Sequence, residues 1–235
     1  SKFSNFHFTA NNETKKRLIK LGEESKNIFA VGCPSIDALN SEKKVSKKKI
    51  IKKLKIDLNE QFLLIIQHPV TSELDKSSIQ IEETLKAVKK SNMQHLIVFP
   101  NNDAGSKNIL KVIKKTRLNF ISTLTLSEYK TLLSENMILV GNSSSGIHEA
   151  ASFKVPVINI GTRQNGRYQP KNIINVNYNN IEISKAIIRA KSDKFKDKIR
   201  KIKNPYGDGN SSVRIIKIIN KLRLKNFNTQ KTLTY

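Results

Sequence analysis

Residues 137–161, MILVGNSSSGIHEAASFKVPVINIG, contain within one short stretch the pattern that determines the fold. The apolar runs MILV and VPVINI have the length of buried β-strands, and GIHEAASF between them has apolar residues at helical spacing. Parallel neighbours in a sheet need a connection of about a dozen residues, usually a helix. The stretch therefore predicts a strand, a crossover helix and a second, parallel strand.

The same alternation of short apolar runs and helical patterns extends from Phe62 to Val176. The runs predict strands at 62–67, 95–99, 119–123, 137–141, 155–161 and 173–176. The intervening segments 77–91, 106–116, 126–135 and 146–153 have the i, i+3, i+4, i+7 spacing of helices. This order is typical of α/β proteins and predicts a Rossmann-like parallel sheet with helices on both faces.

The composition limits the compartment and the kinds of site. Cys33 is the single cysteine among 235 residues, which excludes a disulfide framework within the chain and leaves too few thiolates for a structural zinc or iron–sulfur site. No apolar run approaches the roughly 20 residues that a membrane span needs, and residues 1–13 lack the order of a signal peptide. We predict a cytoplasmic protein with no membrane partner.

The formal charge of +24 would ordinarily indicate nucleic acid or an acidic membrane as partner. The lysines are instead spread over many segments and alternate with Ile and Leu, as on solvated helix faces; examples are KKRLIK, KKKIIKKLK and KFKDKIRKIK. The chain has no Trp, and its aromatic residues do not alternate with basic ones as in base-stacking surfaces. We predict no nucleic-acid partner, and a basic nucleic-acid-binding module stays as an alternative.

The two ends of the chain differ from its middle. Residues 1–10, SKFSNFHFTA, predict neither the strand nor the phosphate loop with which a domain of this class usually starts. The chain is therefore expected to begin within a domain and not at its start. The lysine-rich segment 41–56 predicts an amphipathic helix, and 207–222 predicts a turn and a capped helix with a frayed tail beyond it. We expect a domain tail at 1–30, a Rossmann-like domain at 31–205 and a helical end at 206–235.

The junction after the strand MILV is the strongest local signal for a site. In an open α/β sheet, ligands bind outside the carboxyl ends of the strands. Ser143 and Ser144, with Ser145, supply hydroxyl and backbone N–H groups at a helix N-terminus, which together predict an anion site. Glu149, about one turn further, is placed to accept hydrogen bonds from ribose hydroxyls. A serine-rich helix cap with an ordinary helical glutamate explains the same pattern.

Other strand ends carry polar residues that would meet at the same edge of the sheet. Arg163 in GTRQNGR can pair with phosphate through its planar guanidinium, or be an ordinary surface residue after a glycine turn. His68 in QHPVTSE can donate to phosphate or carry a proton, or simply end its strand. Asn101 in FPNNDAGSK is a candidate ligand or a turn residue, and Asp103 is interpreted as a turn residue.

Several other functional motifs are missing from the sequence. GxGxxG and GxxxxGK[ST] do not occur, and GNSSSG is not the GxSxG of a hydrolase. His7, His68, His95 and His148 are scattered, without an HExxH or CxxC partner, so we predict no metal site. We also expect no cofactor.

Taken together, GNSSSGIHEAASFKVPVINIGTRQNGR, FPNNDAGSK, QHPVTSE, VGCPSID and NPYGDGN resemble the sialic-acid-pathway branch of the UDP-N-acetylglucosamine 2-epimerases. The similarity extends from HFTA at 7–10 to the last predicted helix. It implies one half of a glycosyltransferase-B-type fold, in which the active site lies between two Rossmann-type domains. The NSSSG and GTRQxGR forms resemble the hydrolysing members, which release N-acetylmannosamine and UDP. A non-hydrolysing epimerase and a glycosyltransferase remain alternatives.

The resemblance also implies roles for individual residues. His68, Asn101, Ser143, Ser144, Glu149 and Arg163 match positions that contact UDP in the family, with the two serines and Arg163 on phosphate and Glu149 on ribose. The family's acidic catalytic residues lie in the first domain, so the resemblance implies that this chain alone binds UDP without turnover. His68 is the one catalytic candidate within it. The resemblance further implies a homo-oligomer for the full-length protein.

Overall fold

The computed structural model describes residues 1–222, which form two compact units. One consists of Ser1–Ser41 with the segment from Asn204 onward, and the other is Glu42–Lys203. The divisions thus fall at 41/42 and 203/204, whereas the sequence placed them at 30/31 and 205/206. Residues 31–41 join the first unit because the helix α2 (Pro34–Ser41) packs against α10 (Ser211–Lys221).

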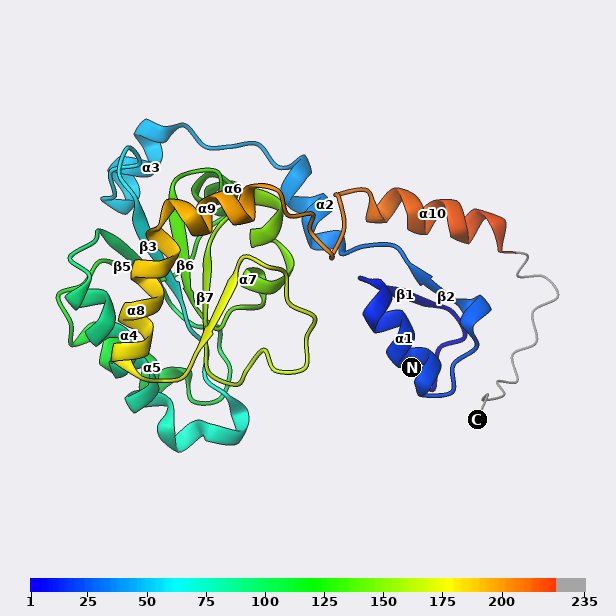
Figure 1. The fold of residues 1–235 in the computed structure, drawn as a ribbon, viewed down its shortest axis with the longest axis horizontal. Helices are drawn as coiled ribbons and strands as arrows, with labels where there is room; N and C mark the ends of the chain where they lie inside the picture. The colour runs from blue at the N-terminus through cyan, green and yellow to red at the C-terminus, as the bar shows by residue number, and fades with distance from the viewer. Residues whose placement is uncertain (223–235) are drawn as a thin grey trace. The chain divides into compact units, whose positions relative to one another are not determined.

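The unit Glu42–Lys203 is built on a six-stranded sheet in which every neighbouring pair is parallel (Figure 1). The strand order is β5-β4-β3-β6-β7-β8. The strands are β3 (Phe62–Ile66), β4 (His95–Val98), β5 (Phe120–Ile121), β6 (Met137–Gly141), β7 (Val157–Ile160) and β8 (Ile173–Val176). The predicted α/β class and parallel sheet are confirmed.

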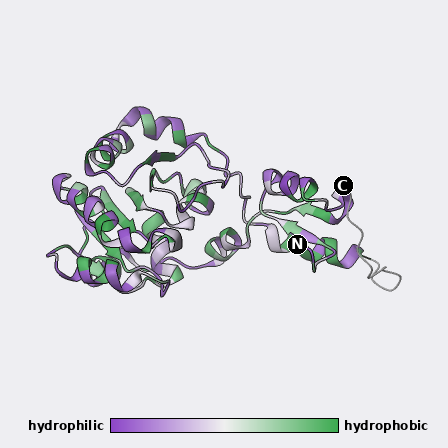
Figure 2. Ribbon diagram, turned by 90° about the horizontal axis from the view of Figure 1, so that it is seen from below, coloured by the Kyte–Doolittle hydropathy of each residue, from purple (hydrophilic) through white to green (hydrophobic). Residues whose placement is uncertain are grey.

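The strands are buried on both faces, which explains their uninterrupted apolar sequences. Leu63 and Ile65 point to one face, together with Ile138 and Val140, and form a core with helices of that face. These helices are α4 (Ser77–Lys90), α5 (Ser106–Lys114), α8 (Asn180–Lys191) and α9 (Asp193–Arg200). In Figure 2 the strands of the sheet are coloured mainly as hydrophobic, whereas the helices around them carry both hydrophilic and hydrophobic residues.

The opposite face of the sheet is covered by other helices. The helix α7 (Ser144–His148) lies so close to it that a side chain at Gly146 would meet Val157 and Leu139. The buried residues of α3 (Lys47–Leu54) and of α6 (Leu126–Leu133), such as Ile50 and Leu132, are not part of the core that Leu63 and Ile65 form on the first face. The helices therefore cover both faces, as the alternating pattern predicted.

Several elements are shorter than the sequence predicted, for different reasons. β5 has two residues, because it is an edge strand paired with β4 alone. The predicted helix 146–153 is the five-residue α7 followed by a 3₁₀ turn at Ala150–Phe153. The predicted helix 41–56 begins only at Lys47, because Glu42 and Val45 instead hydrogen-bond to α6.

The other unit corrects one interpretation of the sequence. Residues 1–10 do contain a strand, β1 (His7–Thr9), which pairs in parallel with β2 (Ile28–Ala30). The three residues of β1 alternate between buried and partly exposed positions, but a run of three is too short for this alternation to be recognised in a sequence. α1 (Asn12–Lys20) follows β1.

The predicted C-terminal helix is present as α10, but its cap comes from elsewhere in the chain. The Asp37 carboxylate accepts hydrogen bonds from the backbone N–H groups of Ser211 and Ser212, at 3.1 and 2.6 Å. The predicted frayed tail lies outside the described residues. Among residues 1–222, no helix has both the length and the apolar character that crossing a bilayer demands.

Candidate functional site

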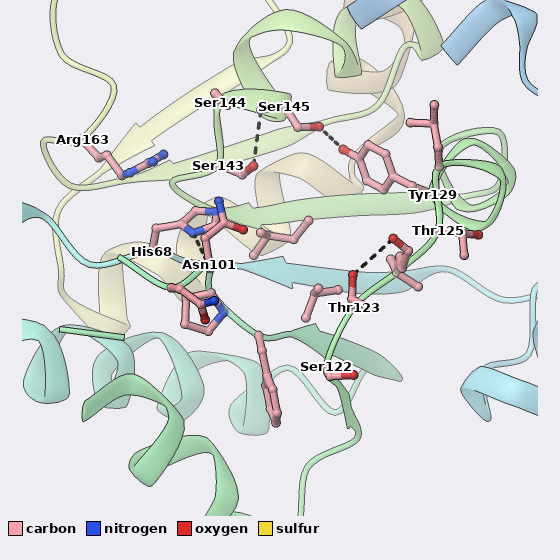
Figure 3. Close-up of a pocket in the computed structure, with 17 residues that line it drawn as sticks. His68, Asn101, Ser122, Thr123, Thr125, Tyr129, Ser143, Ser144, Ser145 and Arg163 are labelled. Atoms are coloured by element: carbon pink, nitrogen blue, oxygen red, sulfur yellow. Dashed lines mark hydrogen bonds between the residues drawn. The ribbon is translucent and has the colours of Figure 1, made fainter. Parts of the chain in front are cut away.

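A cavity of about 780 Å³ opens at the carboxyl ends of the strands in Glu42–Lys203. From the central strand β3 the chain moves outward to β4 and β5, and it then returns to the other side of β3 as β6. This reversal is where α/β sheets bind ligands. The cavity is lined by residues that follow β3, β4, β5, β6 and β7, among them His68, Asn101, Ser122, Thr123, Tyr129, Ser143, Ser144, Ser145 and Arg163 (Figure 3).

His68 lies two residues after the end of β3, and hydrogen bonds hold both its backbone and its ring. Its backbone N–H donates to the Asn142 side chain at 2.7 Å, and its carbonyl accepts from the same side chain at 2.9 Å. The Asn101 backbone N–H donates to Nδ1 of the His68 ring at 3.3 Å. Because Nδ1 accepts, the proton of the neutral ring lies on Nε2. His68 therefore offers the cavity an N–H donor.

The surroundings of His68 keep its ring uncharged near neutral pH. Burial lowers the pKa of His68, the positive charge of Arg163 lowers it further, and Asp103 opposes them; the result is a pKa of about 4, against an ordinary 6.5. A neutral ring with its proton fixed on Nε2 suits hydrogen-bond donation. The catalytic role of His68 stays a prediction.

The lowered pKa of His68 makes stability depend on pH. Because the folded-state pKa lies below that of the unfolded chain, the neutral ring stabilises the fold above about pH 6.5 and this contribution is lost as the pH falls toward 4. We therefore expect the free energy of unfolding of the wild type to fall relative to that of His68→Gln between these two pH values. Denaturant titrations of both proteins measure this difference, and parallel curves would contradict the assignment.

Arg163 follows β7 and reaches the cavity from the neighbouring strand end. One terminal nitrogen of its half-buried guanidinium donates to the backbone carbonyl of Asn142 at 3.1 Å. Burial lowers the pKa of Arg163, Asp103 raises it and Arg167 lowers it. Arginine stays protonated in proteins, so the group is a fixed cation at the cavity wall with further donors for a ligand.

Asn101 and Asp103 follow β4. Asn101 lines the cavity, its backbone N–H donates to His68, and its carbonyl accepts a hydrogen bond from the Ser106 hydroxyl. The Asp103 carbonyl accepts from the Ser106 N–H at 3.1 Å, the contact expected of a turn residue that precedes α5. Asp103 does not line the cavity, although its charge acts on His68 and Arg163.

The serines follow β6 and all three line the cavity. The Ser143 side chain caps α7 by accepting from the Ser145 N–H at 3.3 Å. The Ser145 hydroxyl contacts the hydroxyl of Tyr129. Because α7 is only five residues long, its dipole is small, and the half-buried hydroxyls of Ser143 and Ser144 are the polar groups that this loop presents to the cavity.

Glu149 lies behind the three serines, Ser143 to Ser145. It ends α7, is 9% exposed, and is not among the residues that line the cavity. Burial raises the pKa of Tyr129, and the charge of Glu149 raises it further. The structure thus places Glu149 close to the serine side of the cavity but below its surface.

Several cavity residues were missed in the sequence. Ser122 and Thr123 follow β5, but the predicted strand 119–123 included both, so the strand-end rule that selected His68 and Arg163 passed over them. Tyr129 comes from the middle of α6, and nothing in its spacing from the other residues of that helix indicates that it faces a cavity. Figure 3 shows Tyr129 and Thr123 across the cavity from Arg163. Within residues 1–222, no three His, Cys, Asp or Glu side chains lie together as a metal site.

A protein-family model described as UDP-N-acetylglucosamine 2-epimerase matches residues 1–220. A Legionella pneumophila protein named UDP-N,N'-diacetylbacillosamine 2-epimerase (hydrolyzing) is 35% identical over 95% of this chain. A Neisseria meningitidis protein named UDP-N-acetylglucosamine 2-epimerase is 33% identical over 81% of it. The chain spans 59% and 51% of these two relatives.

The fold also matches solved structures. A Neisseria meningitidis UDP-GlcNAc 2-epimerase bound to UDP-GlcNAc aligns with 93% of this chain and 62% of its own, with a TM-score of 0.78 and 21% identity. A Staphylococcus aureus protein in a co-structure with UDP aligns with 99% of this chain and 62% of its own, with a TM-score of 0.74 and 18% identity. Because both identities are below 25%, these two structures show a similarity of fold alone.

Proposed function

Because the chain belongs to the UDP-N-acetylglucosamine 2-epimerase family, we propose that its cavity binds the nucleotide end of a UDP-linked amino sugar, with UDP-N-acetylglucosamine as the first candidate. The observation that carries the proposal is the meeting of a neutral Nε2–H donor, His68, and a half-buried cation, Arg163, at one strand-end cavity. A diphosphate is the ligand that this pair fits, because both groups donate and neither accepts.

We assign the remaining site residues by position. Ser143 and Ser144 contact phosphate beside Arg163, and Asn101 contacts the ligand from the β4 side. Tyr129 and Thr123 lie across the cavity, where a ring face and a hydroxyl suit a base and its sugar. Glu149 binds the ribose hydroxyls after a small movement of the serine loop that covers it.

The reaction that we propose is the hydrolysing one. Removal of the C2 proton and cleavage of the C1–O bond release UDP and leave a C1–C2 double bond. Addition of water to C1, with a proton returned to C2 on the other face, gives N-acetylmannosamine. Two relatives with 35% and 32% identity are named as hydrolysing enzymes, whereas others carry the plain epimerase name, so the non-hydrolysing reaction is the second candidate.

Within this reaction, the described residues stabilise the departing UDP. Arg163 and the His68 N–H bind the negative charge that develops on the leaving phosphate. We propose that the base for the C2 proton belongs to the part of the relatives that this chain does not span. The chain alone is therefore expected to bind UDP and to leave UDP-N-acetylglucosamine unchanged.

UDP should stabilise the purified chain. A ligand that binds only the folded state adds about 2.7 kcal/mol at a concentration of 100 times its dissociation constant. We expect a rise in melting temperature and a saturable heat of binding with UDP, and no comparable effect with uridine, which lacks the diphosphate. A folded chain that ignores UDP but binds duplex DNA with a steep dependence on salt would favour the nucleic-acid alternative.

The two epimerase reactions differ in their products. Incubation with UDP-N-acetylglucosamine, followed by proton NMR, should show no product from this chain alone; any turnover would give free N-acetylmannosamine if the reaction is hydrolysis and a UDP-linked epimer if it is the alternative. The same experiment tests the expectation that this chain alone turns nothing over. Full activity would show that the described residues already include the base.

A further inference from the structure

Asn142 lies at the centre of the site without facing the cavity. It sits between β6 and α7, is 0% exposed, and is not among the residues that line the cavity. A buried side-chain amide is costly unless its donors and acceptors are satisfied. The hydrogen-bond partners of Asn142 therefore indicate what its side chain does in the site.

The Asn142 side chain extends the pairing of β3 and β6 beyond the end of both strands. The backbone N–H of Asn142 donates to the Ile66 carbonyl at 3.2 Å, as in a regular ladder. Beyond it, the side-chain oxygen accepts from the His68 N–H and the side-chain nitrogen donates to the His68 carbonyl, at 2.7 and 2.9 Å. Pro69 follows and has no N–H to continue a ladder. A single amide thus fixes the His68 backbone where the strand would otherwise be released.

The backbone carbonyl of Asn142 holds the neighbouring strand end. It accepts from the Arg163 guanidinium at 3.1 Å and from the Gln164 side chain at 2.7 Å. Gln164 is 1% exposed, so this second hydrogen bond is shielded from water. The loops after β3, β6 and β7 are therefore joined at one residue.

We propose that Asn142 is a positioning residue for the diphosphate site, holding His68 through its side chain and Arg163 through its carbonyl so that both donors meet one anion. The proposal rests on the proposed function for the identity of the anion. The preorganisation itself rests on the hydrogen bonds alone. Such a residue sets affinity without touching the ligand, because donors held in place need no reorganisation when the ligand binds.

Two substitutions separate positioning from folding. Asn142→Ala removes both contacts to His68. Asn142→Asp has nearly the same shape and still accepts from the His68 N–H, but its carboxylate cannot donate to the His68 carbonyl. Asn172→Ala is the matched control, because Asn172 is also 0% exposed and donates to the Val155 carbonyl at 2.7 Å, away from the cavity.

The experiment is calorimetric titration of the whole chain with UDP. We expect Asn142→Ala to raise the dissociation constant about 10- to 100-fold, and Asn172→Ala to leave it unchanged even if its melting temperature falls. For Asn142→Asp, protonation restores a donor, so its dissociation constant relative to the wild type should fall as the pH is lowered from 8 to 5. His68, Arg163 and Tyr178 are the titratable groups around Asn142, and the ratio to the wild type removes their shared effects. Unchanged affinity in both Asn142 variants would overturn the proposal.

Amide hydrogen exchange tests positioning without UDP. The His68 amide should be protected in the wild type and should exchange rapidly in Asn142→Ala, while the Leu64 amide in β3 stays protected. Equal protection of His68 in both proteins would refute the proposal regardless of UDP. A wild type that ignores UDP while the exchange result holds would refute the proposed ligand and leave the positioning role standing. If Asn142→Ala does not fold, the pH-dependent UDP titration of Asn142→Asp tests the proposal instead, because this variant loses only the donor to the His68 carbonyl.

Discussion

Replacing Arg163 with alanine is expected to raise the dissociation constant for UDP about 30- to 100-fold, which corresponds to roughly 2 to 2.7 kcal/mol. The guanidinium is a fixed cation at the cavity wall, and its anchoring to the Asn142 carbonyl leaves other N–H groups for phosphate. A charged hydrogen bond in a half-buried site is worth more than one at an open surface, because less water competes for it. Isothermal titration calorimetry measures the change directly.

Two further variants show whether the effect depends on geometry. Arg163→Lys keeps the charge but loses the planar set of donors, so we expect a smaller loss than with alanine. Arg117→Ala is the matched control, because Arg117 is an exposed arginine that precedes β5 and therefore lies at the amino edge of the same sheet. If Arg117→Ala weakens UDP binding as much as Arg163→Ala does, overall charge and not the cavity binds UDP.

Gly141→Ala is expected to have the largest effect on stability, a loss of about 4 kcal/mol or more. Gly141 is the last residue of β6, and its φ of +130° is one that residues with side chains rarely adopt. A Cβ there would collide with the Ile66 carbonyl, which is part of the central β3–β6 pairing. Backbone atoms cannot rotate away as a side chain can, so the two central strands would have to separate. Urea denaturation followed by circular dichroism measures the loss.

Gly166→Ala separates the collision from the backbone conformation. Gly166 also has a positive φ, +77°, but nothing lies within 4 Å of the position that a Cβ would take. This substitution should cost only about 1 to 2 kcal/mol, the usual penalty for a left-handed conformation. Similar losses for both variants would mean that conformation, and not the contact with Ile66, makes Gly141 necessary.

The sequence predicted the centre of the fold more accurately than its periphery. β6 and β8 occupy the predicted residues, and β3 and β4 each end one residue early, because strands buried on both faces have uninterrupted apolar sequences. β1 was missed because three residues show no usable periodicity. α3 was predicted too long because the lysines and apolar residues of 41–46 continue its pattern, although those residues hydrogen-bond to α6.

The candidate site was predictable only where it follows a strand. His68, Asn101, Ser143, Ser144 and Arg163 were found because parallel strands bring their carboxyl ends to one edge, and all five line the cavity. Tyr129 could not be found this way, because which helix residue points to that edge depends on how α6 packs. Asn142 was equally hidden, since its importance comes from hydrogen bonds to residues 74 and 21 positions away.

The pairing of β3 with β6 also determines when the site can form during folding. His68 and Asn142 are separated by 74 residues, so their contact closes a long loop and forms only after the intervening chain has been ordered. During synthesis on the ribosome, β3 can therefore pair with β4 first, and it can pair with β6 only after β6 has been synthesised. Non-local parallel pairing of this kind is slow, and the binding cavity is expected to be among the last parts of the chain to mature.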